Sequence, residues 1–506
     1  MPPSPKGTVT QTLYFSAHPE KKLEGTLPSP LCSLLAFQNG VTGDGAKSYL
    51  GQQEDLQEEF HLCQPSIMAA TVPNWHSYLQ VIQSREDQRV QHFQKAENVL
   101  FIVLERVKTM DPRVIVDYSR NSEALEFSLS AAENEVTMEV PLCINSEVLL
   151  MQPCTDEHSN SENITNGDCQ VPGSFYLGVP KQETNLENWT KEDVFSSVDD
   201  VNSRGHIVPG KVLHLLKELI VAAIVHCKHH NLIKPGELSA ERLNEDGMQL
   251  PLLVSSDWKT ICFNIIPVIR RKQDTLNNWQ ERGFPKGSLS KITQEAVFIP
   301  ASYHHWRYST NRPISKLVQI LRTLKGYRLD SLCLLDQINH EYWKEKGEEK
   351  GLTFQHLKMI LLWATHFFPS TEDWLSLEGS VYRLLVILLC CLVTKDLPHF
   401  LYPEQNLFND SLDLTALYSK VETFAISPKY FLKFYFAQRE GKKSHQKDNG
   451  LKALLYLPAE NRDFWDTAFF DMLLSKFQAY QIKDTQRISA MSSILSKIKE
   501  MVHNES

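Results

Sequence analysis

The residues of this sequence with the clearest chemical potential lie on two predicted strands. In segment 134–145, polar residues at alternate positions include Thr137 and Glu139. Segment 260–269 is rich in β-branched residues and carries Asn264. Two acids at i and i+2 on a strand, with a third acid on a neighbouring strand, hold the two metal ions of nucleotidyl transfer. Only Glu139 is such an acid here, so the pattern raises a question about catalysis.

Helices and further strands must position these two segments. Apolar residues at three- and four-residue spacings predict a long helix over 75–107, and a second helix is expected over 208–226, with Pro209 in its first turn. Strand patterns cover 249–255 and 124–129. After residue 300 the pattern is helical, which together with the mixed first half predicts an α+β fold. The helical segments expected there are 317–324, 354–367, 374–393, 412–424, 464–480 and 484–502.

Length and composition are those of an ordinary globular protein. The 506 residues, 42% hydrophobic and 22% charged, suffice for two or three domains with a large core. A net charge of -9 disfavours a protein built mainly to wrap nucleic acid. Ten cysteines without a CxxC pair, and no secretory signal, predict reduced thiols in a cytoplasmic or nuclear protein. The apolar run 384–393 is shorter than the ~20 residues of a membrane helix, so it predicts a buried core helix.

Changes in composition divide the chain into expected regions. Residues 1–70 mix Pro, Gly, Ser and Gln without a period and predict a disordered extension. Strands and helices alternate over 71–300, where a polar loop is expected at 151–175. The remaining regions are a helical lobe at 301–438, an exposed linker at 439–450 and a C-terminal helical extension at 451–506.

Several segments together carry a family pattern. The most specific of these segments extends from Leu397 to Phe408 and is similar to the "PHyFlP..nLf" signature of the Mab-21-like family. The members of this family are relatives of cyclic GMP-AMP synthase in the nucleotidyltransferase-fold superfamily. The resemblance spans about residues 75–430. It implies a nucleotidyltransferase-like mixed α/β lobe, an all-helical C-terminal lobe, a long N-terminal helix bridging both, and a groove between them. The other matching segments are 105–113, 123–127, 138–142, 306–307 and 352–358.

On the family's pattern, the paired acid positions are Thr137 and Glu139, and the third is Asn264. Two of three negative charges are therefore missing. Glu135 shares the strand face but lies about 13 Å from Glu139, too far to share a metal pair unless the strand bulges. The family's upstream glycine, in the loop that cradles phosphate in active relatives, is Ala124, whose Cβ hinders an approaching anion. These departures predict a pseudo-nucleotidyltransferase without metal or cofactor. Glu139 is either a vestigial pocket acid or a solvated strand acid, and Asn264 is a vestigial ligand or a buried amide bonded to backbone.

Positive charge near the expected groove suggests another kind of site. Lys211, Arg270 and Arg271 are candidates to bind a phosphate, a nucleotide or an acidic partner, with a solvated strand end as the plainer alternative. So few cations do not suffice for double-stranded DNA. The zinc loop of the DNA-sensing relatives has no counterpart, since 306–324 contains no cysteine. The cluster at 226–230 is explained by cationic residues at a helix C-terminus.

The sequence thus predicts a non-catalytic scaffold or regulatory protein that acts through contacts with an unidentified protein partner, which the resemblance links to cell differentiation. The first alternative is a sensor that binds a nucleotide or another anion in the groove without catalysis. The second is an active nucleotidyltransferase that uses Glu135. Neither membrane association nor binding of double-stranded DNA is expected.

Overall fold

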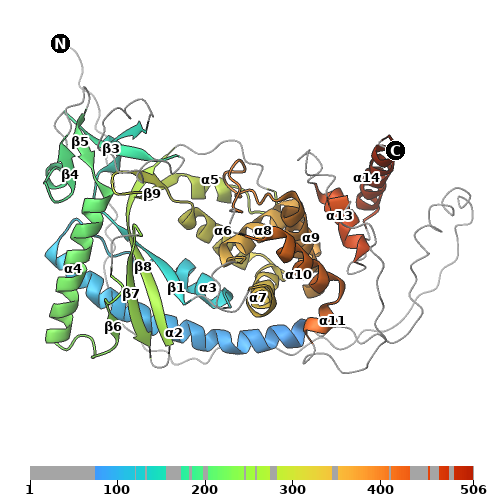
Figure 1. Cartoon of the computed structure of the whole chain (residues 1–506), viewed down its shortest axis with the longest axis horizontal. Coiled ribbons are helices and arrows are strands. Elements are labelled where there is room, and N and C mark those ends of the chain that lie inside the picture. The colour runs from blue at the N-terminus through green and yellow to red at the C-terminus, as the bar shows by residue number, and fades with distance from the viewer. Residues whose placement is uncertain are drawn as a thin grey trace, which may run out of the picture. The chain divides into compact units, whose positions relative to one another are not determined.

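The structure is a computed structural model (Figure 1), and it describes residues 75–119, 121–131, 134–154, 173–181, 185–197, 203–243, 247–256, 259–273, 282–344, 351–408, 412–432, 454–455, 466–477, 482 and 484–504. The chain divides into two units, Met1–Ala70 and Thr71–Ser506, and every described residue lies in the second. The expected extension (1–70), the linker (439–450) and most of the polar loop (151–175) lie outside the described residues. The domain boundaries therefore stay predictions.

Helix α2 (Trp75–Met110) belongs to both halves of the fold and runs along the lower edge of Figure 1. Near its start, Trp75 and Tyr78 are buried in the core of the helical half, whereas Phe93 and Val107 are buried in a second core, against the sheet. The apolar stripe predicted this helix, and it ends just before Pro112, as expected. The predicted bridge between the two lobes is confirmed.

A mixed sheet of ten described strands organises the first half. Its longest strand, β8 (Lys259–Lys272), pairs with β7 and β1 along its first part and with β9 at its end. Only β1 among the described strands pairs in parallel. Helices α2 and α4 (Pro209–His229) share a core with β1, β7 and β8. The other strands are β1 (Glu135–Pro141), β2 (Leu150–Pro153), β3 (Phe175–Pro180), β4 (Phe195–Ser197), β5 (Ser203–Ile207), β6 (Leu238–Ser239), β7 (Leu250–Ser256), β9 (Glu295–Pro300) and β10 (Trp306–Tyr308).

Helices fill the second half, as the periodicity predicted. Helix α9 (Leu377–Thr394) is, among the described residues, the one helix long and apolar enough to cross a membrane, yet 89% of it is buried inside the protein. Its apolar surface is needed on all sides because α7, α8, α10 and α13 pack around it. The other helices here are α5 (Ser288–Thr293), α6 (Asn311–Thr323), α7 (Arg328–Ile338), α8 (Phe354–Phe367), α10 (Leu414–Ile426) and α11 (Pro428–Phe431). The predicted α+β class is confirmed.

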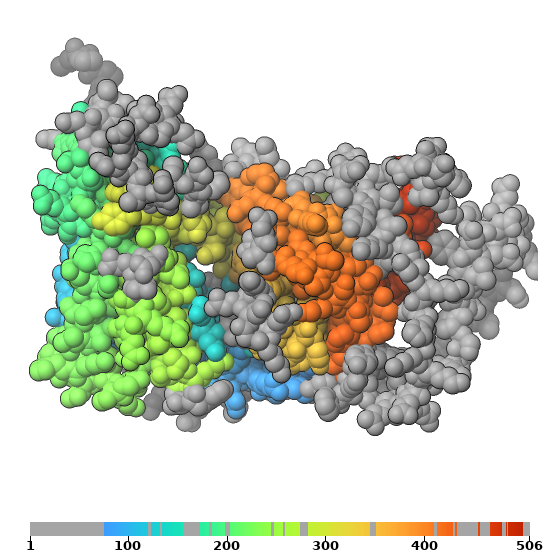
Figure 2. Space-filling model, in the orientation of Figure 1, coloured from blue at the N-terminus to red at the C-terminus, as the bar shows by residue number. Residues whose placement is uncertain are grey.

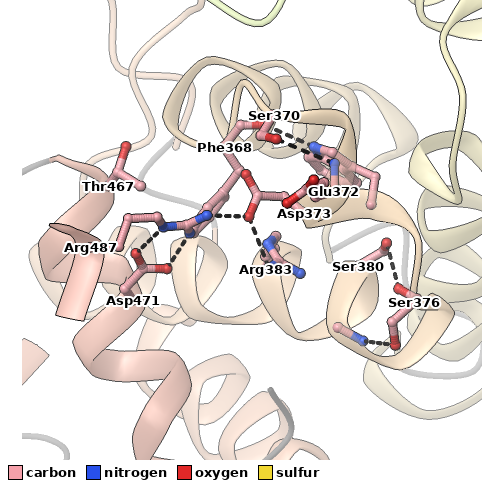
Figure 3. A network of polar contacts seen from close by, with 12 residues as sticks. Phe368, Ser370, Glu372, Asp373, Ser376, Ser380, Arg383, Thr467, Asp471 and Arg487 are labelled. Carbon is pink, nitrogen blue, oxygen red and sulfur yellow. Dashed lines mark hydrogen bonds and ion pairs between the residues drawn. The ribbon is translucent and has the colours of Figure 1, made fainter. Parts of the chain in front are cut away.

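Two further helices, α13 (Thr467–Lys476) and α14 (Thr485–Asn504), pack on the helical half through buried charge (Figure 3). Arg487 of α14 donates two hydrogen bonds to Asp471 of α13, at 2.8 and 2.6 Å, and one to Asp373 at 2.5 Å. Asp373 lies on the short helix η5 (Thr371–Trp374) and also accepts a bond from Arg383 of α9 at 3.3 Å. The side chains of Asp471 and Asp373 are 0% and 1% exposed. The core therefore depends on an arginine that lies more than a hundred residues from Asp373.

The stretch 124–129 is helical, so the strand predicted there is wrong. Helix α3 (Asn121–Leu129) buries Leu125 and Leu129 in the core of the helical half and Phe127 in the core against the sheet. Apolar residues at these three positions have the period of a strand, but positions four apart also share a helix face, and a short run cannot distinguish the two. The loop expected at 151–175 also loses its ends to strands β2 and β3.

Candidate functional site

The two strands that the sequence singled out lie side by side. In the parallel β1–β8 pair, Thr137 lies directly opposite Asn264, and Glu139 lies opposite Ile266. Neighbouring strands are ~4.8 Å apart and paired residues share a face, so the three vestigial metal-site positions form one group. The register is unbroken along the whole of β1. The bulge that an enzyme using Glu135 would require is therefore not present in this strand.

A pocket of about 280 Å³ lies in front of β1. Its walls come from β1 and α3 on one side and from the N-terminal parts of α6 and α8 on the other. Figure 2 shows this region, in cyan, between the green atoms of the sheet and the orange helices. The pocket is lined by Glu123, Glu126, Phe127, Glu135, Val136, Thr137, Glu139, Asn311, Arg312, Ser315, Thr353, Phe354, Gln355 and Lys358. Thr137 and Glu139 thus reach a cavity, whereas Asn264 is not part of its lining.

A guanidinium lies beside Glu139, the one acid among the three predicted metal-site positions. Arg312 Nη1 lies 3.8 Å from Glu139 Oε2 and 3.5 Å from Asp117 Oδ2, and its Nε lies 3.3 Å from Glu295 Oε2. Glu139 is only 9% exposed, so its charge needs a nearby counter-charge. In an active two-metal site that counter-charge is supplied by the ions. Here a side chain of the protein itself supplies it.

Further pairs balance the charge around Arg312. Arg270 Nη2 donates to Asp117 Oδ2 at 2.5 Å, and Lys316 Nζ donates to Glu295 Oε2 at 3.1 Å. Burial raises the pKa of Asp117, but hydrogen bonds from Ser119 and Arg270 outweigh it and hold that pKa well below its usual range. Burial likewise raises the pKa of Glu295, and the Lys316 and Arg312 cations outweigh it. These carboxylates are therefore ionised at neutral pH and are already matched by cations of the chain.

A second ion pair spans the pocket. Lys358 Nζ of α8 donates to Glu126 Oε2 of α3 at 2.7 Å, with the lysine side chain 8% exposed and the glutamate 19%. The ammonium also lies 5.6 Å from the centre of the Phe354 ring. The pair therefore ties the pocket wall that packs on the sheet to the wall formed by the helical half.

The three candidate anion-binding cations lie outside the lining of this pocket, although Arg270 contacts Asp117 beside Arg312. Lys211 Nζ donates to the backbone carbonyls of Glu192 and Phe195, at 3.0 and 2.7 Å. Arg270 binds Asp117, and Arg271 donates to the Leu149 carbonyl at 3.1 Å. None of the three belongs to the pocket lining. Nucleotide binding stays a prediction, but these cations already contact groups of the protein.

The residues at the three predicted metal-site positions do not fit a two-metal centre. Thr137 and Asn264 offer a hydroxyl and an amide where hard cations need carboxylates, and the Arg312 guanidinium beside Glu139 repels a cation. Among the described residues, no group of three or more His, Cys, Asp or Glu side chains is arranged to hold a metal ion. No reaction step can be assigned to such ions on these residues.

The residues behind the family pattern in the helical half have structural roles. His356 completes a capping box with Thr353 at the start of α8, and its Nε2 donates to the Leu407 carbonyl at 3.2 Å. His399 Nδ1 accepts from the backbone of Leu401 and Tyr402, at 3.1 and 3.3 Å. The signature segment therefore forms a loop that packs on α8 through these hydrogen bonds.

Arg312 is the site residue that the sequence reasoning missed. It lies in the first turn of α6, where the positive end of the helix dipole makes a cation unfavourable by ~0.3–1 kcal/mol. A cation at such a position indicates that acids from elsewhere compensate it. That signal is present in the sequence, but it does not say which acids do so.

Comparisons with known proteins point the same way as the resemblance. The family profile described as "Mab-21 protein HhH/H2TH-like domain" matches residues 314–423, which run from α6 to α10. The chain is 23% identical over 274 residues to "Protein mab-21-like 3" of Xenopus laevis, covering 51% of this chain and 71% of the relative. It is 22% identical over 276 residues to the Danio rerio protein of the same name, covering 51% and 68%.

Proposed function

We propose that this chain, which belongs to the Mab-21-like family, is a non-catalytic member that works through contacts with other proteins. The observation that carries the proposal is the guanidinium of Arg312 at 3.8 Å from Glu139, the one acid left at the vestigial site. With Thr137 and Asn264 at the other two positions, the site has one carboxylate where two-metal chemistry uses three. A nucleotidyltransferase-like fold is thereby kept without its ion-binding charges.

Charge arithmetic supports this proposal. Asp117, Glu139 and Glu295 are matched by Arg270, Arg312 and Lys316, so a metal ion would enter a cluster that is already neutral. To bind there it would have to displace a guanidinium or add positive charge beside one. Both cost free energy in a half-buried environment.

Metal binding tests the proposal most directly. Titration with Mn²⁺, followed by electron paramagnetic resonance, should show no tight site in the full-length protein. The variant Thr137→Asp/Asn264→Asp/Arg312→Ala restores the carboxylates and removes the competing cation, so we expect it to gain Mn²⁺ binding. The matched control Thr137→Asp/Asn264→Asp keeps Arg312 and should gain less.

An assay of nucleotide turnover tests directly whether the chain is an enzyme. Full-length protein is incubated with ATP, GTP or CTP and Mg²⁺ or Mn²⁺, beside the variant Glu139→Ala. Turnover by the wild type that disappears in the Glu139→Ala variant would show that the chain is an enzyme and would end the proposal.

The pocket favours a second candidate function, the binding of a small ligand without catalysis. Its lining carries four glutamates against Arg312 and Lys358, so a polyphosphate without metal is disfavoured and a neutral or cationic polar ligand fits better. Thermal-shift screening with nucleotides, nucleosides and polyamines tests this, with Ser315→Trp as a variant that fills the pocket. A shift that persists in Ser315→Trp would place the ligand elsewhere.

Several finer assignments rest on the sequence alone. The sequence as a whole looks closest to the fourth Mab-21-like paralogue. The family resemblance implies a regulatory or adaptor role in cell differentiation, and the cysteine pattern without a secretory signal predicts a cytoplasmic or nuclear location. Affinity purification with mass spectrometry from native tissue addresses the partner. Recovery of no specific protein at near-native expression would contradict a role through protein contacts.

A further inference from the structure

Helix α4 presents an apolar face to solvent on the side away from the sheet. Val221 is 43% exposed and Val225 is 63% exposed, and Ala222 between them is exposed as well. Residues three and four apart share a helix face, so these three form one small patch in the C-terminal half of the helix. Leu232 and Ile102, 52% and 37% exposed, are further apolar groups on this part of the protein. In Figure 1, α4 lies at the left-hand edge.

The helix face that carries this patch has an exposed acid on one side of the patch and an exposed lysine on the other. Towards its N-terminus, Glu218 is 67% exposed and lies 3.4 Å from His214. Towards its C-terminus, Lys228, His229 and His230 are exposed, and the rings of His226 and His230 lie 4.0 Å apart. On the face of the patch, Lys228 therefore places a positive charge at one end, and Glu218 places a negative charge at the other.

We propose that α4 pairs with α4 of a second copy of this chain, antiparallel about a two-fold axis between Val221 and Ala222. That axis sets Glu218 beside Val225 of the second copy and within one helical turn of its Lys228 and His229. Because the axis is two-fold, the same contacts form twice.

The chemistry of the face favours a second copy over an unrelated partner. On this face, Glu218 of each copy meets Lys228 of the other copy when one copy is turned end for end. The antiparallel arrangement also sets the two helix dipoles in opposite directions, which is favourable. The small side chains at the centre let the two helices approach closely.

The dimer should be weak. One helix per copy buries less than the ~1,600 Å² of a standard interface, so we expect dissociation in the micromolar range. Sedimentation velocity of the full-length protein between about 1 and 200 μM should show the sedimentation coefficient rising with concentration. This range brackets the affinities typical of small interfaces.

Charge exchange tests the register. Glu218→Lys places like charges at both ends and should raise the dissociation constant by about tenfold or more, since two exposed pairs reverse sign. Lys228→Glu should do the same. The double variant Glu218→Lys/Lys228→Glu restores opposite charges across the two-fold axis and should return the affinity close to wild type.

The apolar centre gives a second test. Val225→Glu should abolish the dimer over the whole concentration range, whereas Ile426→Glu, at an apolar residue 41% exposed in the helical half, should leave it unchanged. A wild type that stays monomeric at 200 μM, or a dimer indifferent to Val225→Glu, would overturn the proposal. A double charge variant as weak as the single variants would overturn the antiparallel register. Circular dichroism confirms that each surface variant is folded.

Discussion

Arg487→Ala should destabilise the packing of the last two helices on the helical half. The side chain makes three charge-assisted hydrogen bonds, two to Asp471 and one to Asp373. After truncation, Asp373 keeps its bond from Arg383, but Asp471 loses both bonds from Arg487 while it stays buried. Removing one partner of a buried ion pair costs about 3–5 kcal/mol, and we expect a loss in that range.

The loss has an upper limit set by local opening. If α13 and α14 detach, Asp471 can reach water, so the cost cannot exceed the free energy that holds this pair of helices in place. The effect should therefore appear first as faster hydrogen exchange in 467–476 and 485–498. Global denaturation in urea, followed by circular dichroism, would shift less than the exchange data.

Two companion variants separate the charge from the packing. Arg487→Lys keeps the charge but loses the fork that bonds Asp471 twice, so it should fall between wild type and Arg487→Ala. Arg487→Met/Asp471→Asn removes both charges and should cost less than Arg487→Ala alone, because no bare carboxylate remains. A loss below about 1 kcal/mol in Arg487→Ala, with unchanged exchange, would refute the reasoning.

Three other outcomes follow from the same structure. Lys358→Ala should cost about 2–4 kcal/mol because it leaves Glu126 without the partner at 2.7 Å, while Lys358→Met/Glu126→Gln should cost less; urea denaturation of both variants checks this. Burial lowers the pKa of His399 to about 4, which the Glu404 charge offsets only in part, so the folded protein keeps this ring neutral. The contribution of the neutral ring to the free energy of unfolding is present in full above pH 6.5 and is lost as pH falls towards 4, because the unfolded chain binds the proton more tightly. In urea titrations, His399→Asn should reduce the slope of that free energy against pH by about 1.4 kcal/mol per pH unit. An unchanged slope would contradict this. Gly283→Ala should cost about 2–4 kcal/mol, since φ is +78° and the new Cβ would collide with the Thr365 carbonyl oxygen; a thermal melt indistinguishable from wild type would contradict this.

Long periodic elements could be predicted from the sequence because their own residues define them. In α2 the spacing of apolar residues defines one apolar face over several turns, whereas in α9 the continuous apolar run shows that the helix is buried on all sides. Helix α3 could not be predicted because it is nine residues long, and its apolar residues fit two periods at once. Which period wins depends on the two cores that it contacts, and those cores come from distant parts of the chain.

The candidate site divides in the same way. The family pattern assigned Thr137 and Asn264 to one site on neighbouring strands, and in the structure the two residues lie opposite each other; their role as former metal-site positions stays a prediction. The partners of Arg312 could not be deduced, because Asp117, Glu139 and Glu295 come from three separate segments of the chain. The tertiary fold determines such charge pairs. The local sequence shows only that Arg312 lies at an unfavourable position for a cation, and it does not show which acids compensate the charge.

The connectivity of the site also has a consequence for how the protein folds. Arg270 and Asp117 are 153 residues apart in sequence, and Lys358 and Glu126 are 232 apart. Closing such long loops costs conformational entropy before the contact contributes any stabilising free energy, so contacts of this kind form late and slow folding. The pocket should thus be among the last parts to assemble, and its carboxylates stay hydrated until the rest of the chain is in place. Stopped-flow refolding, with Lys358→Met/Glu126→Gln beside wild type, should then show a change in the unfolding rate and almost none in the folding rate.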